Sequence, residues 1–440
     1  MMAKIHKRLL ISLCFILCLL SSGTAQSVRE MIKKDPSYAA CNYRIYPDSV
    51  EMPMTPAPEG KHPFYISHYG RHGSRYINNR KGYDLPYKMM LKADSLGLLT
   101  TAGHQVLKQI RTIINDSEGQ WGDLTGFGQL QMRHICQRMM NRFPEVLSGD
   151  AHVDARSTVV NRCILSMGSF MMEMAKLNPQ LQITMRASKR DMWYLNHQDK
   201  LLRKMPDATQ EAYDAFVDKY SRNPKLMKLL FTDPDAASKV VDETWLNYYI
   251  IKMGLFQLNT HFYRDTFLTD LFDIEDLYNL WKTDNVWWYL NHGSSELNGG
   301  DRPFTQRYLL RQIIADADSC LQLERPGAQL RFGHESVLLP LTCLLGINGY
   351  DKHIDDWEDV EAQGWRSSDV FPMGSNIQLV FYRSDINDQD VLFKVLLNEQ
   401  EAQLPMTTDC APYYHWKDFR AFYLDKLDKY DERRKKLSDK

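Results

Sequence analysis

Residues 64–75 read FYISHYGRHGSR, an apolar and aromatic run from Phe64 to Tyr69 that ends at Gly70 and continues into a turn. A short apolar run that ends at a glycine is typical of a buried strand followed by a tight turn. Ligands of open α/β sheets bind outside the carboxyl ends of the strands. The sequence therefore predicts a functional site at the turn of residues 71–75.

The turn itself carries two arginines on either side of a histidine, Arg71, His72 and Arg75, together with Gly73. Arginine offers paired donors and a permanent charge to a phosphate group, a neutral imidazole can attack phosphorus, and glycine permits close approach of the backbone. The alternative is a basic turn on the surface, but two like charges packed beside a histidine are costly without an anion. We therefore expect a phosphate site with His72 as the nucleophile.

A second candidate, His334 followed by Glu335, comes directly after another predicted strand that ends at Gly333. A histidine beside a carboxyl group can supply one donor to a phosphate oxygen and one proton to a leaving group. Adjacent His-Glu pairs are common in proteins without such a role. The significance of this pair therefore depends on its position at a strand end.

A third candidate is the junction between a predicted strand, Ala151 to Arg156, and the helix that follows it. We expect Ser157 or Thr158 to cap this helix and Arg162 to lie about one turn inside it, where the helix N-terminus favours an anion. Taken alone, Arg162 would be a helix-surface arginine. The three elements together favour a single phosphate site.

Strand and helix patterns alternate over much of the chain, which indicates a parallel sheet layered by helices. Thr125 is expected to cap one of these helices and Pro144 to end it. The strands are predicted at residues 64–69, 151–156, 181–185, 329–332, 376–382 and 391–397, with the last two as a hairpin, and the helices that pack on them at residues 124–143, 157–177 and 338–345.

The middle of the chain differs, because it contains helical patterns at residues 209–230, 239–261 and 305–321 and no convincing strand. We therefore expect an α/β fold with a three-layer α/β/α core and an inserted, mainly α-helical second domain. The N-terminal arm is expected to be extended, because its five prolines forbid long helices. The predicted divisions are a signal peptide at 1–25, the arm at 26–61, the α/β core at 62–196 and 322–440, and the helical insertion at 197–321.

The first 25 residues have the features of a secretory signal peptide. Three basic residues, Lys4, Lys7 and Arg8, precede an apolar run that ends at Leu20 and is too short for a transmembrane helix. Small residues follow up to Ala25, after which we expect cleavage. The sequence thus predicts a secreted or periplasmic protein, with an uncleaved membrane anchor as the alternative.

The composition is that of a globular protein, with 44% hydrophobic and 25% charged residues among 440. Loss of residues 1–25 removes three of the 54 Lys and Arg and leaves 51 against 55 Asp and Glu, a formal charge of −4. A nucleic-acid-binding protein would normally be basic, so we expect no nucleic-acid partner. A local cationic pocket for a small anionic substrate needs only a handful of residues and remains compatible with this charge.

Cysteine usage leaves the redox chemistry open. An even number of cysteines in an exported chain permits up to three disulfides, and the fifteen pairings of six cysteines stay open. The sequence has no CxxC pair and no HExxH stretch, so it predicts no metal site, and no cofactor is expected. The six cysteines after residue 25 are Cys41, Cys136, Cys163, Cys320, Cys343 and Cys410.

These motifs resemble those of the histidine acid phosphatases, a branch of the histidine phosphatase superfamily. Within that group, the segments 332–335 and 396–399 look most like the multiple inositol polyphosphate phosphatases, which act as phytases. The family motifs and the segments similar to them are the RHGxRxP signature at 71–77, the LTxxG turn at 124–128, the STxxxR helix start at 157–162, and the strand-entry segment at 371–377.

Two positions depart from the family pattern. The animal members of the inositol phosphatase branch have His-Ala-Glu, whereas Glu335 follows His334 directly. Most other histidine acid phosphatases have His-Asp, so Glu335 has their register with a longer side chain. Ile77 replaces the usual proline, which affects only the local shape of the loop.

The resemblance implies a two-step mechanism without metal. His72 attacks phosphorus to give a phosphohistidine, Glu335 protonates the leaving group, and water then cleaves the phosphohistidine. A carboxyl group must be protonated to act first, which predicts an acid-shifted pH optimum unless burial raises its pKa. The phosphate-binding side chains in this scheme are Arg71, Arg75, Arg162 and His334.

The substrate implied by the resemblance is an inositol polyphosphate, above all phytate. A broad-specificity acid or sugar phosphatase of the same family is the alternative, and a non-catalytic phosphate-binding protein would need neither His72 nor Glu335. A hexakisphosphate ring needs further cations around the pocket. Candidates for the pocket are His68 and His152, for which a core position is the equal alternative, and Arg156, Lys189, Arg190, Lys33 and Lys34, each of which would otherwise be a solvated surface residue.

Overall fold

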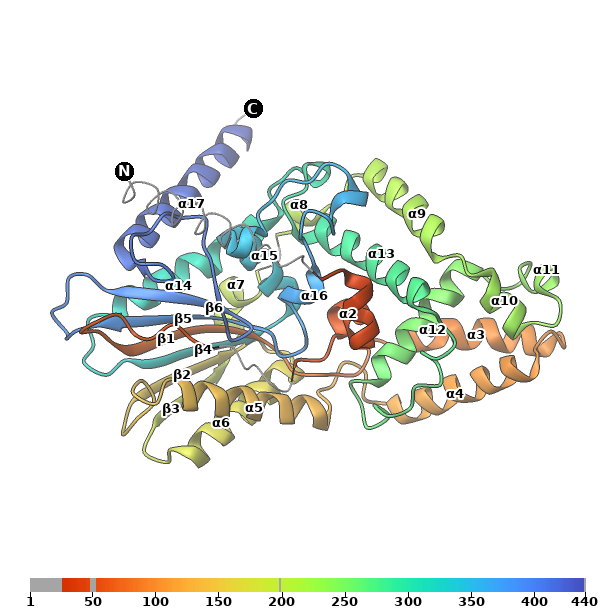
Figure 1. Ribbon diagram of the computed structural model, residues 1–440, viewed down its shortest axis with the longest axis horizontal. Helices are drawn as coiled ribbons and strands as arrows, with labels where there is room; N and C mark the ends of the chain where they lie inside the picture. Colours follow the sequence, from red (N-terminus) through yellow and green to blue (C-terminus); the bar gives the residue numbers. More distant parts are fainter. Residues whose placement is uncertain (1–25, 48–52, 198, 439–440) are drawn as a thin grey trace, which may run out of the picture.

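The computed structural model describes residues 26–47, 53–197 and 199–438. It confirms an α/β core with helices on both faces of one sheet and a mainly helical part beside it (Figure 1). The predicted signal peptide lies outside the described residues, and export stays a prediction. Within the described ranges, no helix combines the length and the apolar character that a membrane crossing requires.

One mixed sheet forms the centre of the core, in the order β3-β2-β4-β1-β5-β6-β7, with β8 paired to β6. The strands from β3 to β1 run parallel, and β5 and β6 are each antiparallel to their neighbours. All six predicted strands are confirmed, including the hairpin of β5 and β6. The strands are β1 (His62–Arg71), β2 (His152–Ser157), β3 (Gln182–Ala187), β4 (Gly327–Gly333), β5 (Asn376–Arg383), β6 (Leu392–Leu397), β7 (Gln400–Ala402) and β8 (Tyr414–His415).

Helices cover both faces of this sheet (Figure 1). Alternate residues of a strand face the two layers, so Ile66 packs in the cluster of α5 and α6 while Tyr65 packs in the opposite one. Thr125 caps α5 as predicted, by accepting a hydrogen bond from the backbone of Gly128 at 3.1 Å. The covering helices are α5 (Gly126–Arg142) and α6 (Asn161–Leu177) on one face, and α14 (Arg307–Cys320), α15 (Glu335–Leu345) and α17 (Trp416–Ser438) on the other.

The helical part is assembled from two separate segments of the chain. α3 (Lys81–Ser95) and α4 (Thr101–Ser117) pack against α12 (Glu243–Gln257) and α10 (Pro224–Leu230), although they precede α5 in sequence (Figure 1). The expected boundaries placed α3 and α4 in the α/β core and α14 in the helical insertion, and the structure differs at both points. An amphipathic pattern shows that a helix has a buried face, but it does not show which neighbour covers that face.

The pattern predicted as one helix over residues 209–230 is two helices in the structure. The chain breaks at Asn223, whose side chain accepts a hydrogen bond from the backbone of Leu226 at 3.0 Å and so caps α10, with Pro224 in the first turn. The remaining helices of the described chain are α7 (Met192–Leu195), α8 (Lys200–Arg203), α9 (Asp207–Ser221), α11 (Pro234–Ala237), α13 (Ile274–His292), α16 (Ser367–Val370), and the 3-10 helices η2 (Lys189–Asp191), η3 (Glu296–Asn298), η4 (Arg302–Gln306), η5 (Ile347–Gly349) and η6 (Trp357–Asp359).

The N-terminal segment is partly helical, so the prediction of an extended arm was wrong there. It contains α2 (Val28–Lys34) and the 3-10 helix η1 (Pro36–Tyr43), which pack against α13 and α16. Pro36 is at the start of η1, where a backbone N–H would have no partner within the helix. The N–H that proline lacks is therefore not needed at this position. Prolines in this segment limit the length of its helices but do not prevent short ones.

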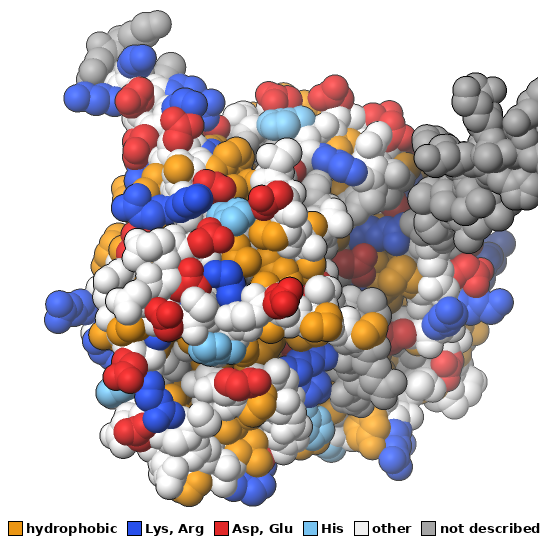
Figure 2. Space-filling view, turned by 60° about the vertical axis from the view of Figure 1, so that its left-hand side comes forward, with side chains coloured by type: hydrophobic (Ala, Val, Ile, Leu, Met, Phe, Trp, Pro, Cys, Tyr) orange, Lys and Arg blue, Asp and Glu red, His pale blue; other side chains and the backbone are white. Residues whose placement is uncertain are grey.

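The prediction of disulfides is not supported, because all six cysteines within the described ranges are free thiols. Five of them are buried, and only Cys410 is partly exposed. The surface seen in Figure 2 carries basic and acidic side chains interspersed with one another, as expected for a chain of nearly balanced charge. That face has no single-sign area of the kind that attracts a polyanion.

Candidate active site

The loops that follow β1 and β4 leave the sheet side by side. The two strands are parallel neighbours, and Arg71 lies opposite Gly333 in their register. As a result His72 and His334, which are 262 residues apart in sequence, have ring centroids only 5.8 Å apart. The structure thus brings the first two predicted motifs together at the carboxyl ends of the central strands.

The turn after β1 is fixed by close contact with the start of α5. A Cβ atom on Gly73 would lie 2.4 Å from the carbonyl oxygen of Gly128, so only glycine fits there. The backbone N–H of Gly73 donates to the hydroxyl of Ser166 at 3.1 Å, and that of His72 donates to the carbonyl of Gly333 at 3.0 Å. Glycine therefore serves the packing of the turn, which holds His72 in a defined orientation.

Arg71 is fully buried, and its guanidinium is held at both ends. Nη1 donates to the carbonyl of Phe371 at 2.6 Å and Nη2 to the carbonyl of Asn42 at 2.7 Å, while Nε lies 3.1 Å from a carboxylate oxygen of Glu335. Burial lowers the pKa of the Arg71 guanidinium to about 10, so the group remains charged at neutral pH. Arg71 is therefore a fixed cation whose Nε side faces an anionic group, the carboxylate of Glu335.

The imidazole of His72 is held in one tautomer. Its Nδ1 lies 2.9 Å from the carbonyl oxygen of Gly73, which can only accept, so Nδ1 carries the proton and Nε2 presents its lone pair. Burial holds the pKa of His72 well below its usual range, although Glu335 opposes this effect. A neutral, oriented imidazole is the form in which histidine acts as a nucleophile.

The carboxylate of Glu335 lies among the cations of the site. It is 3.1 Å from Nε of Arg71, 3.5 Å from Nη2 of Arg75 and 3.5 Å from Nε2 of His72. Arg75 is buried and also donates to the hydroxyl of Tyr43 at 3.1 Å. Burial alone would raise the pKa of the Glu335 carboxyl, but the positive charges of Arg71 and Arg75 hold this pKa well below its usual range.

His334 and Arg162 complete the cluster from two other elements. His334 precedes α15, and its Nε2 lies 3.3 Å from the hydroxyl of Thr158 and 3.7 Å from the sulfur of Cys163. Burial lowers the pKa of His334 to about 4. Arg162 is the second residue of α6; its Nη1 lies 3.5 Å from the carbonyl of Gly122, and its buried Nε has no hydrogen-bond partner among the described residues.

The predicted cap of α6 is absent. The helix begins at Asn161, later than expected, and no side chain caps it at Val160. Ser157 instead donates to the carbonyl of Thr158 at 2.8 Å. The N-terminal N–H groups of α6 are thus not consumed by a side-chain cap, which suits a helix start beside an anion site.

Three potential metal ligands meet here, since ligand atoms of His72, His334 and Glu335 lie within 4.8 Å of one another. Two permanently charged guanidiniums, of Arg71 and Arg75, flank the same carboxylate. A divalent cation would be repelled by these charges, whereas an anion would be attracted. The arrangement therefore favours a phosphate group.

Of the predicted pocket residues, neither histidine lies at the site. His68 is a core residue: it is 2% exposed, its ring packs 5.5 Å from that of Phe332 and 6.1 Å from that of Phe170, and burial lowers its pKa to about 3. His152 is exposed at the first residue of β2, whereas the site lies at the other end of that strand. Five residues of strand separate it from Ser157, roughly 17 Å.

The predicted cations outside the motifs also lie elsewhere. Arg156 is paired with Asp154 at 2.6 Å and also lies 3.7 Å from Asp316, so its charge is already compensated on the sheet face. Lys189 and Arg190 are exposed in η2 after β3, which β2 and β4 separate from β1. Lys33 and Lys34 are exposed at the end of α2.

The structure adds residues that were not predicted to belong to the site. Asn42 and Tyr43, from the N-terminal segment, hold Arg71 and Arg75 respectively. Phe371 holds Arg71 through its carbonyl, and the ring of Trp288 on α13 packs 4.7 Å from the ring of Phe371. Asn42 and Tyr43 carry no recognisable sequence signal, because their contribution depends on how the N-terminal segment packs.

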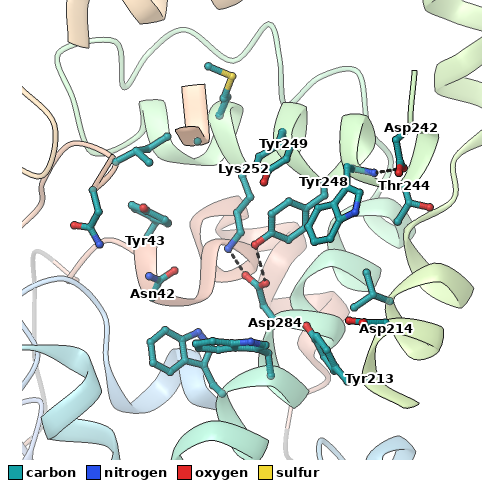
Figure 3. Close-up of a pocket in the computed structure, with 18 of the residues that line it drawn as sticks. Asn42, Tyr43, Tyr213, Asp214, Asp242, Thr244, Tyr248, Tyr249, Lys252 and Asp284 are labelled. Carbon is teal, nitrogen blue, oxygen red and sulfur yellow. Dashed lines mark hydrogen bonds and ion pairs between the residues drawn. The ribbon is translucent and has the colours of Figure 1, made fainter. Parts of the chain in front are cut away.

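A cavity of about 900 Å³ adjoins the site between the N-terminal segment and the helical part (Figure 3). Asn42, Tyr43 and Trp288 belong to its wall, so the cavity and the catalytic cluster share a boundary. Lys252 on α12 and Asp284 on α13 point toward each other inside it and form an ion pair (Figure 3).

A family model of the histidine phosphatase superfamily (branch 2) matches residues 70–398, which include all of the clustered motif residues. The chain belongs to this family. It is therefore an enzyme of the histidine acid phosphatase type, a hydrolase of phosphoric monoesters, with an α/β core and a helical domain, as the resemblance implied.

One relative in sequence and two solved structures are similar to this chain. Multiple inositol polyphosphate phosphatase 1 of Gallus gallus is 20% identical over 321 residues, which cover 68% of each chain. The crystal structure of the multiple inositol polyphosphate phosphatase of Bifidobacterium longum, in complex with inositol hexasulfate, has a TM-score of 0.68 at 16% identity over 86% of this chain and 96% of that one. The phytase of D. castellii has a TM-score of 0.64 at 12% identity over 89% and 85%.

Proposed function

We propose that this histidine phosphatase hydrolyses phosphate monoesters through a phosphohistidine formed on Nε2 of His72. The observation that carries the proposal is the neutral, oriented imidazole of His72 beside the guanidiniums of Arg71 and Arg75. Nε2 forms a bond to phosphorus as the bond from phosphorus to the leaving oxygen breaks, and the cations stabilise the charge on the phosphate oxygens. Water then attacks phosphorus and releases His72.

Glu335 is proposed to move the protons in both steps. In the first step it gives a proton to the leaving oxygen, and in the second it accepts one from the attacking water. The low pKa of Glu335 in the ligand-free protein opposes the first role only while the carboxylate is paired with the arginines. When a phosphate dianion takes that pairing, the carboxyl group faces a like charge, and its pKa rises.

We propose inositol polyphosphates as substrates, with phytate as the first to test. Support comes from the relatives, which are named as inositol polyphosphate phosphatases and phytases, one of them crystallised with inositol hexasulfate. A sugar phosphatase is the second candidate, because the cavity beside the site contains more carboxylates than cations.

The test is phosphate release from phytate and from an aryl phosphate by the protein from residue 26 onward, with a chelator present throughout. We expect chelator-resistant release, its loss in His72→Ala, and an acid-labile phosphoprotein after rapid quenching with a radiolabelled substrate. An Arg156→Ala variant is the matched control, since Arg156 lies outside the site. Full turnover by His72→Ala would overturn the mechanism.

A further inference from the structure

The cavity in Figure 3 adjoins the residues that hold the two arginines of the site. Its wall includes Tyr43, whose hydroxyl accepts from Arg75, and Asn42, whose carbonyl accepts from Arg71. An ester whose phosphate lies between those arginines therefore has the open space of the cavity beside it, beyond Asn42 and Tyr43. At about 900 Å³ the cavity is at the upper end of the range for small-molecule sites, large enough for more than one six-membered ring.

The charges in this cavity are unfavourable for a polyanion. Its described lining contains one cation, Lys252, whose side chain is only 12% exposed and is paired with Asp284. Three further carboxylates line it, those of Asp214, Asp218 and Asp242, of which Asp218 is paired with Arg222 at 2.8 Å. Additional phosphate groups on a substrate ring would meet these carboxylates at close range, where like charges repel.

The remaining lining suits a ring that bears hydroxyl groups. Two indoles, Trp245 and Trp287, are 44% and 37% exposed and offer flat apolar faces to the C–H face of such a ring. The carboxylates accept hydrogen bonds from hydroxyls, and neutral amides and phenols in the same wall both donate and accept. These neutral groups are Asn42, Asn78, Asn79, Gln210, Tyr213, Tyr248 and Tyr249.

We propose that this cavity binds the uncharged, hydroxyl-bearing part of the substrate and disfavours a ring that is phosphorylated all round. The inference rests on the phosphatase activity proposed above and defines its substrates further. Two sources share the required chemistry: an inositol ring from which several phosphates have already been removed, and the sugar of a sugar phosphate. In either case the scissile phosphate lies at His72 and the free hydroxyls face α9 and α13.

The first test compares kcat/KM of the unaltered enzyme for inositol hexakisphosphate, an inositol monophosphate and glucose 6-phosphate at low ionic strength. We expect at least one monophosphate to be preferred over the hexakisphosphate by about tenfold or more, and the better monophosphate identifies the source. A tenfold preference for the hexakisphosphate would overturn the inference. If the enzyme hydrolysed none of these three compounds and no aryl phosphate either, the proposed function itself would be overturned.

The second test reverses one charge of the cavity wall. Asp214 is exposed on α9, and its one hydrogen-bond partner among the described residues is the side chain of Gln210. The substitution Asp214→Lys therefore reverses the charge with little effect on packing. We expect kcat/KM for the hexakisphosphate to rise several-fold and the gain to disappear in high salt. Glu432→Lys, exposed on α17 away from the cavity, is the control for net charge and leaves the preference unchanged. Equal effects of the two variants would show that the cavity does not contact the substrate.

The third test removes an aromatic face. Trp287→Ala is expected to raise KM for the preferred monophosphate by about tenfold with little change in kcat, because it removes stacking but leaves the catalytic cluster intact. Unphosphorylated myo-inositol and methyl glucoside should also quench the tryptophan fluorescence of the unaltered enzyme and of His72→Ala alike. Absence of both effects, in an enzyme that hydrolyses phosphate esters, would overturn the inference alone.

Discussion

A carboxylate oxygen of Glu335 lies 3.5 Å from Nε2 of His72, the atom that we propose attacks phosphorus. Reacting atoms approach to about 3–3.5 Å before bond formation, so this oxygen lies where a phosphoryl group has to be. The same carboxylate is paired with Arg71 and Arg75. In the ligand-free protein the carboxylate of Glu335, the proposed proton donor, thus occupies the place expected for the phosphate, and in the proposed mechanism it moves away when a phosphate binds.

Removal of this carboxylate charge should separate binding from turnover. In Glu335→Gln the arginines lose their internal anion, so we expect the Kd for vanadate to fall by about tenfold or more, while turnover falls by about 10²–10⁴ because the proton donor is gone. Titration calorimetry and steady-state rates measure the two effects. Glu432→Gln on the exposed face of α17 is the control. Weaker anion binding in Glu335→Gln would contradict the internal-anion arrangement.

Anion binding should take up a proton. In the free protein the pKa of Glu335 is held well below its usual range, and it rises when an anion takes over Arg71 and Arg75. Between the two pKa values the complex therefore binds a proton that the free protein lacks, and affinity increases as the pH falls. Sulfate does not titrate in this range, so its calorimetric titration in two buffers of different ionisation enthalpy measures the uptake. Equal uptake by Glu335→Gln would assign the proton to another group.

Glu399 should be a large contributor to stability. It is 1% exposed, its carboxylate is 2.8 Å from Nη2 of Arg138 on α5, and it accepts from the hydroxyl of Tyr46 at 3.0 Å. Glu399→Gln removes the charge that balances a partly buried guanidinium, so we expect the free energy of unfolding to fall by about 3 kcal/mol. Urea denaturation measures the change. A loss below about 0.5 kcal/mol, the level of an ordinary surface substitution, would mean that the pair is not needed.

Reducing agents should leave the enzyme unaffected. All six cysteines in the described ranges are free, whereas loss of a structural disulfide typically costs about 2–5 kcal/mol. We therefore expect the same Tm with and without dithiothreitol. Thiol titration of the protein from residue 26 onward, unfolded without reductant, should find six thiols. Fewer thiols together with a lower Tm in reductant would disagree with the structure.

The centre of the site was predictable because strand ends follow from local patterns. The apolar run from Phe64 to Tyr69 predicts a strand, and Thr125 predicts the start of a helix. Tertiary contacts did not override either local preference. The alternation of side chains along β1 could also have excluded His68 from the pocket. His68 is two residues after Ile66 and so lies on the same face of the strand, which packs against α6. The placement of α3 and α4 and the contacts of Asn42 could not be predicted, because they depend on which surfaces meet after the chain has folded.

The position of β1 has a consequence for biosynthesis. Its partners β4 and β5 both come late in the chain. Arg71 lies opposite Gly333, which the ribosome adds 262 residues later. At about 5–20 residues per second, synthesis of this stretch takes roughly 10–50 s. Until then the strand has no neighbours, and closing so long a loop is slow. A nascent or prematurely terminated chain that stops before β5 therefore lacks a strand that holds β1, and with it Arg71 and Arg75, in place. We expect activity to appear in a single late step of synthesis, and no shorter fragment to be partly active.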